Sequence, residues 1–245
     1  MRNHNSELEI RIRGRGITEY THEGMVFVEG RHRSEFEIYL KNNSSRQRLF
    51  IPSVDGLSVV NGKPASSNSP GFVIDGYDSI IIPGWMTDSN HAAKFYFSLS
   101  NKEPSYSEKM GYSDKNNGVI GVRIFDKSEK RLTPSPFTSP APVANQGIWN
   151  SSGNPSRDLP RGICSVSVNS FLDGKELGTG WGEETYFSTT EVEFEKNLNS
   201  VCDLVIFYDT REGLKARGVD IINKKSRRST MGAAPFPGDY CQPPK

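Results

Sequence analysis

The feature that most constrains the fold of this chain is a succession of short runs in which apolar and polar residues alternate. In residues 7–13 the alternation is strict, so Leu8, Ile10 and Ile12 share one face and charged residues occupy the other. Residues 35–41 repeat the pattern. A period of two residues predicts strands that bury one face.

Other segments meet the same criteria, with turn-forming residues between them. Further strands are predicted at residues 25–28, 49–51, 57–60, 71–74, 79–82, 94–99, 118–125, 163–168, 186–194 and 202–208. The polar residues 42–45 predict a hairpin between strands 35–41 and 49–51. The pair Asn61-Gly62 predicts a type I′ turn, because both residues tolerate positive φ.

The number and spacing of these runs predict an all-β fold, an antiparallel β-sandwich of jelly-roll or immunoglobulin-like type. Hydrophobic residues make up only 34% of the 245 residues, while 23 glycines and 15 prolines indicate many turns and irregular segments. One short helix is expected at residues 211–217, ended by Gly218.

The chain divides by pattern into four parts. Residues 1–127 form the N-terminal portion of the sandwich, and residues 162–222 add strands that complete the same domain. Residues 128–161 lose the periodicity and are rich in proline, which predicts a long loop or arm. Residues 223–245 predict an extended tail that starts with a basic run. We expect a neighbouring subunit to order the arm and the tail.

Charge excludes two classes of partner. Thirty Lys and Arg residues face 29 Asp and Glu residues, a net charge of +1, so neither nucleic acid nor an anionic membrane is an expected partner. No apolar run is long enough to cross a bilayer, and no secretory signal is recognised, which predicts synthesis in a cytoplasm. Three widely spaced cysteines predict reduced thiols, with Cys202 as a small buried apolar residue.

No pattern predicts a catalytic centre, a cofactor or a metal. The histidines lack zinc-ligand spacing, and no helix follows Gly178–Gly182 to make a phosphate loop, so a tight bend or bulge packed by Trp181 is expected there. Glu191, Glu193 and Glu195 are predicted to share a solvated strand face rather than to form a glycosidase pair.

Two sets of residues are candidates for an interaction surface. They are the tryptophans Trp85, Trp149 and Trp181 and the basic tail residues Lys224, Lys225, Arg227 and Arg228.

Five segments occur in an order that resembles an uncharacterised family of bacterial and bacteriophage proteins. They are Ser53–Lys63, Gly84-Trp85, Asn117–Val122, Leu177–Gly182 and Tyr208–Leu214. The resemblance covers residues 28 to 219 and implies that they form one unit, interrupted by the proline-rich excursion. It implies no activity and no functional residues.

These observations favour a non-enzymatic structural protein of a bacteriophage virion, such as a capsid decoration or accessory component. Its expected partners are neighbouring capsid or tail subunits in a homo- or hetero-oligomer, and it would reach the virion after synthesis in the host cytoplasm. The alternative is a binding module in the bacterial cytoplasm, in which Trp85, Trp149 and Trp181 recognise a glycan or a protein. A hydrolase that uses acidic strand residues such as Glu193 ranks third.

Overall fold

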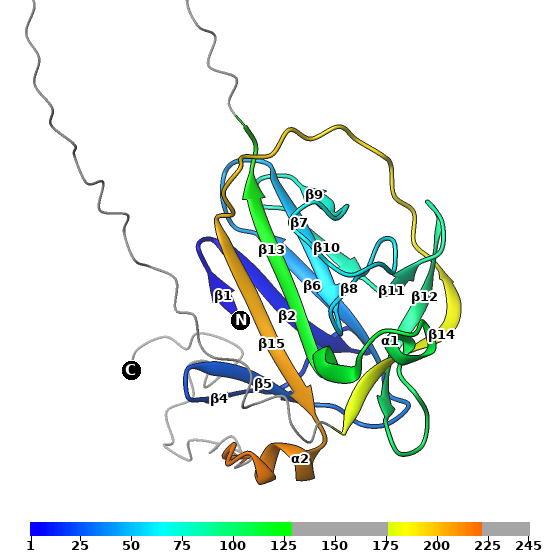
Figure 1. Ribbon diagram of the computed structural model, residues 1–245. Helices are drawn as coiled ribbons and strands as arrows, with labels where there is room; N and C mark the ends of the chain where they lie inside the picture. Colours follow the sequence, from blue (N-terminus) through cyan, green and yellow to red (C-terminus); the bar gives the residue numbers. More distant parts are fainter. Residues whose placement is uncertain (129–175, 222–245) are drawn as a thin grey trace, which may run out of the picture.

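The computed structural model describes residues 1–128 and 176–221, and strands in two sheets make up about half of this part, with only short helices beside them (Figure 1). The all-β prediction is therefore confirmed. Its finer form, a jelly-roll or immunoglobulin-like sandwich, stays a prediction. The strand expected at 163–168, nearly all of the proline-rich segment and the tail lie outside the described residues.

The first sheet has eight strands and ends at β14 on one side. Its strands are β1 (Arg2–Asn3), β2 (Ser6–Ile12), β3 (Arg15–Gly16), β6 (Glu35–Asn42), β10 (Ser79–Ile82), β11 (Gly84–Met86), β12 (His91–Leu99) and β14 (Leu177–Tyr186). β12 pairs with β11 and with the start of β6, and β14 runs antiparallel to β12.

The second sheet has seven strands and is mixed. Its strands are β4 (Glu19–His22), β5 (Met25–Glu29), β7 (Arg48–Val54), β8 (Leu57–Ser58), β9 (Phe72–Ile74), β13 (Val119–Asp126) and β15 (Cys202–Asp209). β15 pairs antiparallel with β13 and parallel with β5. The helical elements are α1 (Tyr106–Lys109), a 3₁₀ turn (Asp114–Asn116) and α2 (Arg211–Ala216). No helix in the described residues is long and apolar enough to span a membrane.

One hydrophobic core joins the two sheets. Leu8, Phe36 and Phe95 of the first sheet belong to the same buried cluster as Phe50 and Ile120 of the second. All five side chains are at most 1% exposed. Burial of each such side chain contributes about 1.5–3 kcal/mol, so this shared core holds the sheets face to face.

Most of the strand predictions are confirmed within a residue or two, from β2 at residues 7–13 to β15 at residues 202–208. The short helix also forms, with Thr210 as its N-cap and Gly218 at a φ of 78° just beyond its end. Cys202 is only half-buried, against the edge of the core.

The hairpin predicted around residues 42–45 is wrong, because β6 and β7 belong to different sheets. The chain turns a corner there instead. The amide Nδ2 of the fully buried Asn42 donates to the carbonyl oxygens of Arg46, Ile74 and Asp75 at 2.7–3.0 Å. The Asn42 side chain thus provides hydrogen-bond donors for backbone carbonyl groups where the chain passes from one sheet to the other.

The type I′ geometry lies at Asp55-Gly56 rather than at Asn61-Gly62. Asp55 and Gly56 have φ of 50° and 78° and connect Val54 to its β8 partner Leu57, whereas Asn61 has no positive φ. A two-residue loop with two positive φ angles matches the twist of the paired strands. Asp55 is therefore presented at a fixed corner of the second sheet.

The Asp55 carboxylate fastens the first sheet to the second. It is buried and accepts hydrogen bonds from the backbone N–H of Gly118 (2.9 Å), the backbone N–H of Thr179 (2.6 Å) and the Tyr208 hydroxyl (2.6 Å). Thr179 Oγ1 and the Tyr208 hydroxyl lie 2.6 Å apart. Four of the five segments that carry the family resemblance therefore meet at one structural network.

Residues 178–182 lie within β14, with a register shift opposite Ala93 and Phe95. The bulge expected here is present, but the tight bend is not. A Cβ on Gly180 would fall 2.1 Å from the Tyr96 ring, so only glycine fits beneath this aromatic side chain.

The strand predicted at residues 186–194 is wrong. Tyr186, the last residue of β14, pairs with His91, the first residue of β12. Beyond Tyr186 the chain has no residue of β12 left to pair with. Alternation of apolar and polar residues cannot by itself supply the backbone hydrogen bonds of a strand there. Glu191, Glu193 and Glu195 are exposed but share no strand face.

Candidate groove-forming site

A long connection leaves the end of β14 and crosses one end of the molecule before entering β15 (Figure 1). We call it the arc, residues 187–201. At its start the Phe187 ring packs edge-on against Phe72 at a centroid distance of 6.0 Å. At its end the N–H of Val201 donates to the Ile124 carbonyl at 2.7 Å. The arc is thus fastened at both ends to the second sheet.

A groove of about 720 Å³ lies between the arc and the ends of the strands. Its apolar lining comes from Leu49, Val60, Phe72, Val73, Ile80, Met86, Val192 and Phe194. Its polar lining includes Thr87, Ser89, Ser188, Thr189 and Thr190. An apolar floor with polar groups around it is the usual composition of a binding site.

The charge of the groove has one sign. Asp75, Asp88 and Glu191 line it, and no Lys, Arg or His is among its described lining residues. Carboxylates beside an apolar floor disfavour anionic ligands and attract cationic ones. The groove is therefore suited to a ligand that has both apolar and positively charged groups.

The start of the arc is hydrogen-bonded to the 89–90 loop. The N–H groups of Phe187 and Thr189 donate to the carbonyls of Asn90 and Ser89 at 2.8 and 2.7 Å. Bonding by every second residue is the pattern of an extended backbone, in which alternate N–H groups point to opposite sides. The arc therefore begins as a short stretch of extended backbone that is held against the 89–90 loop.

A small cluster of titratable groups adjoins the groove. His91 Nδ1 lies 3.0 Å from Asp88 Oδ2 and 4.0 Å from Glu184 Oε1. The hydrogen bond to Asp88 raises the pKa of His91, and the pKa of Asp88 is lowered by hydrogen bonds from the Asn90 backbone and from His91. These three side chains have atoms close enough together to hold a metal ion. All three side chains are solvent-accessible. The attraction between His91 and the two carboxylates is enough to explain why they lie together.

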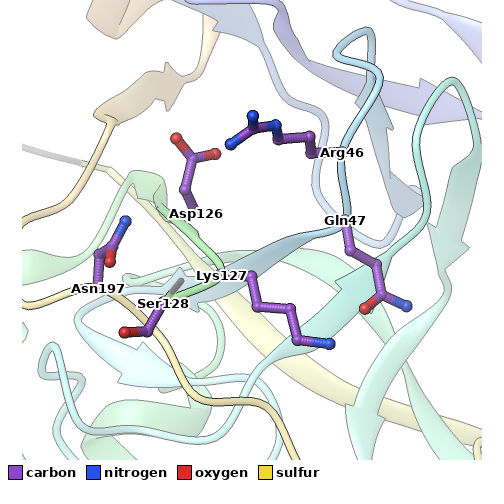
Figure 2. Close-up of a pocket in the computed structure, with 6 residues that line it drawn as sticks. All are labelled: Arg46, Gln47, Asp126, Lys127, Ser128 and Asn197. Atoms are coloured by element: carbon purple, nitrogen blue, oxygen red, sulfur yellow. The ribbon is translucent and has the colours of Figure 1, made fainter. Parts of the chain in front are cut away.

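A second hollow, of about 650 Å³, has a polar lining of Arg46, Gln47, Asp126, Lys127, Ser128 and Asn197 (Figure 2). In Figure 2 the Arg46 guanidinium points toward the Asp126 carboxylate, which also accepts a hydrogen bond of 2.7 Å from Arg48 Nε. This hollow borders Ser128, where the described chain stops.

The structure separates the tryptophans expected on one interaction surface. Trp85 is 1% exposed, and its indole N–H donates to the Gly180 carbonyl at 3.2 Å, so its assignment to a surface was wrong. Its flat ring fills the core beside Phe95. Trp181 is 39% exposed and lies 4.9 Å from the Tyr106 ring, which in turn contacts Trp85. Trp149 and the basic residues Lys224, Lys225, Arg227 and Arg228 lie outside the described residues.

The sequence analysis missed the groove because its lining comes from segments as distant as Gln47 and Phe194. It also missed the cluster of Asp88, His91 and Glu184, since Glu184 is distant in sequence and reaches the others only through the pairing of β12 with β14. No spacing rule finds such sites.

Comparisons with known proteins add no relative. No protein-family model matches the chain, and searches of curated proteins and of solved structures find no match. The resemblance to an uncharacterised family of bacterial and bacteriophage proteins therefore stays a prediction.

Proposed function

We propose that this protein is a non-enzymatic structural protein that assembles with further copies of itself through the groove beneath the arc. The observation that supports the proposal is a groove that combines apolar lining residues and carboxylates with the extended backbone at the start of the arc. Those are the features by which an extended segment of another chain is bound. In keeping with the sequence analysis, we place the assembly in a bacteriophage particle, as a capsid decoration or accessory component.

The rigid body around the groove supports this role. The Asp55 carboxylate ties both sheets together by buried hydrogen bonds, and the arc is fastened at each end. A preorganised groove loses little conformational entropy when a partner binds. A small loss of conformational entropy favours an assembly in which each copy is held by a contact of modest size.

Self-association is tested with two matched substitutions on the arc. Val192 lines the groove and is 59% exposed, whereas Leu198 is fully exposed and outside the groove. Each can be changed to lysine without disturbing the core. The mass of the full-length chain is measured by light scattering over a range of concentrations.

We expect the unsubstituted chain to form oligomers, and Val192→Lys to weaken the association by ~10-fold or more. Leu198→Lys should leave it unchanged. A chain that stays monomeric up to ~100 μM would refute the proposal. A dissociation constant weaker than that is reached by nonspecific contacts between proteins and does not require a groove. Equal effects of the two substitutions would also refute it.

Exposure of Trp181 favours a second candidate, a glycan-binding module. The indole packs at a tilt against the Tyr106 ring and is still 39% exposed, and a partly exposed aromatic ring can bind the apolar face of a sugar. Binding on a glycan array that is lost in Trp181→Ala and kept in Tyr186→Ala would support this function. An array without a bound glycan would reject it.

A further inference from the structure

We infer that the occupant of the groove is the basic C-terminal segment, residues 224–236, of a second copy of this chain. The inference rests on the proposed function and names the part of the neighbouring copy that would enter the site. It is argued from charge, from the order of side chains in the segment and from the reach of the chain.

Charge complementarity is the first argument. The groove presents the carboxylates of Asp75 and Glu191 without a lining cation among the described residues, and that of Asp88, which also pairs with His91 beside the groove. The segment begins with Lys224-Lys225-Ser226-Arg227-Arg228, which has four cations and no anion. The net charge of the whole chain is only +1, so the acidic groove and the basic segment are local concentrations of opposite charge. It gives the contact an orientation as well as an attraction.

The apolar residues of the segment are the second argument. Met231 and Phe236 follow the basic run, with small residues and proline around them. Methionine adapts to irregular apolar surfaces, and the phenylalanine ring supplies a large contact area. The floor of the groove, which includes Leu49, Phe72 and Met86, is where such side chains would be buried.

The reach of the chain keeps Lys224 and Lys225 from the groove of their own copy. Ile221, the last described residue, packs with Phe207 and Leu214 near the end of β15 that leads into α2. Figure 1 shows α2 at the opposite end of the molecule from the arc. Lys224 lies three residues beyond Ile221 and so within about 11 Å of it.

The distance to the groove along the sheet is greater. Phe207 pairs with Val119 and Leu49 pairs with Phe125 on the same strand β13. Six residues of strand separate these two levels, which is about 20 Å. Lys224 and Lys225 therefore fall short of the groove of their own chain, whereas Arg228, seven residues beyond Ile221, has a reach of about 25 Å. A contact between either lysine and the groove consequently requires a second copy.

The experiment uses the full-length chain in two isotopic forms, unlabelled and ¹⁵N-labelled, mixed in equal amounts. A carbodiimide joins lysine amines directly to carboxylates that contact them, and the cross-linked peptides are read by mass spectrometry. We expect links from Lys224 or Lys225 to Asp75, Asp88 or Glu191, about half of them between a light and a heavy chain.

Matched charge variants complete the test. Neutralising the segment in K224Q/K225Q/R227Q/R228Q should weaken self-association by ~10-fold or more and remove its dependence on salt, because screening acts on these charges. Neutralising the exposed Lys102 and Lys115 in K102Q/K115Q should leave the association unchanged.

Three outcomes overturn the inference. Links only within one isotopic form would place the segment on its own chain, the absence of these links would place it elsewhere, and equal effects of the two charge variants would leave the segment without a specific role. If the chain still self-associates and Val192→Lys still disrupts the oligomer, the proposed function stands and only the identity of the occupant is rejected.

Discussion

The hydroxyl of Tyr208 donates a hydrogen bond of 2.6 Å to the carboxylate of Asp55, and both side chains are buried. Tyr208 belongs to β15, and Asp55 occupies the turn between β7 and β8. The same carboxylate accepts the N–H of Thr179 in the other sheet. The Asp55 carboxylate therefore links three segments that are far apart in sequence. The role of this polar turn is to hold the two sheets together.

Removal of the Tyr208 hydroxyl should destabilise the fold. In Tyr208→Phe the ring is kept, but Asp55 and Thr179 lose a buried partner, and an unsatisfied buried polar group costs about 1–3 kcal/mol. Urea unfolding measures the loss. Tyr186→Phe, on a side chain that is 74% exposed, should change the free energy of unfolding by less than about 0.5 kcal/mol. Equal effects would show that the Asp55 network carries little stability.

The same hydroxyl should make stability depend on alkaline pH. Burial, and then the negative charge of Asp55, raise the pKa of Tyr208 well above its ordinary value. In the unfolded chain a tyrosine releases its proton near pH 10, while the folded state keeps it, so the folded state binds more protons and stability falls as pH rises above about 10. Below that pH the contribution is constant. Unfolding measured from pH 8 to 11 should show a steeper decline for the wild type than for Tyr208→Phe, and parallel curves would contradict the assignment.

A methyl group at residue 180 should not be tolerated. The Cβ in Gly180→Ala would lie 2.1 Å from Tyr96, so the ring or β14 must move, and overpacking of this kind costs about 1–3 kcal/mol. Gly121→Ala is the control, because its Cβ would meet only the Ser53 Oγ at 3.1 Å. Thermal unfolding should show a much larger loss for the first variant. Indole fluorescence should change with it, since Trp85 donates to the Gly180 carbonyl.

Replacement of Asp88 at the rim of the groove should change the pKa of His91. The hydrogen bond that His91 donates to Asp88 raises the pKa of His91, so Asp88→Asn should bring that pKa back toward the ordinary histidine value. Titration of the His91 ring protons by NMR measures both values. Glu184→Gln should have a smaller effect, because its carboxylate lies 4.0 Å from the imidazole rather than 3.0 Å. An unchanged pKa in Asp88→Asn would show that the pair does not persist in solution.

Most of the strands could be predicted from the sequence, because alternation with a period of two specifies which side chains can be buried together. The sequence also specifies the short helix, whose cap residue Thr210 and terminal Gly218 are local signals. It failed at residues 186–194, where the pattern continues but β12 supplies no partner, and at residues 42–45, where a polar turn crosses between sheets.

The identity of the residues that meet in space depends on the tertiary structure. The position of Trp85 in the core, the convergence of the conspicuous motifs on Asp55 and the groove beneath the arc all depend on strand pairing between distant segments. A strand's pattern specifies which face is buried, but its partner is chosen by the packing of the whole core. The physical reason is that alternation is local, whereas burial and hydrogen bonding between sheets are satisfied only by contacts made across the chain.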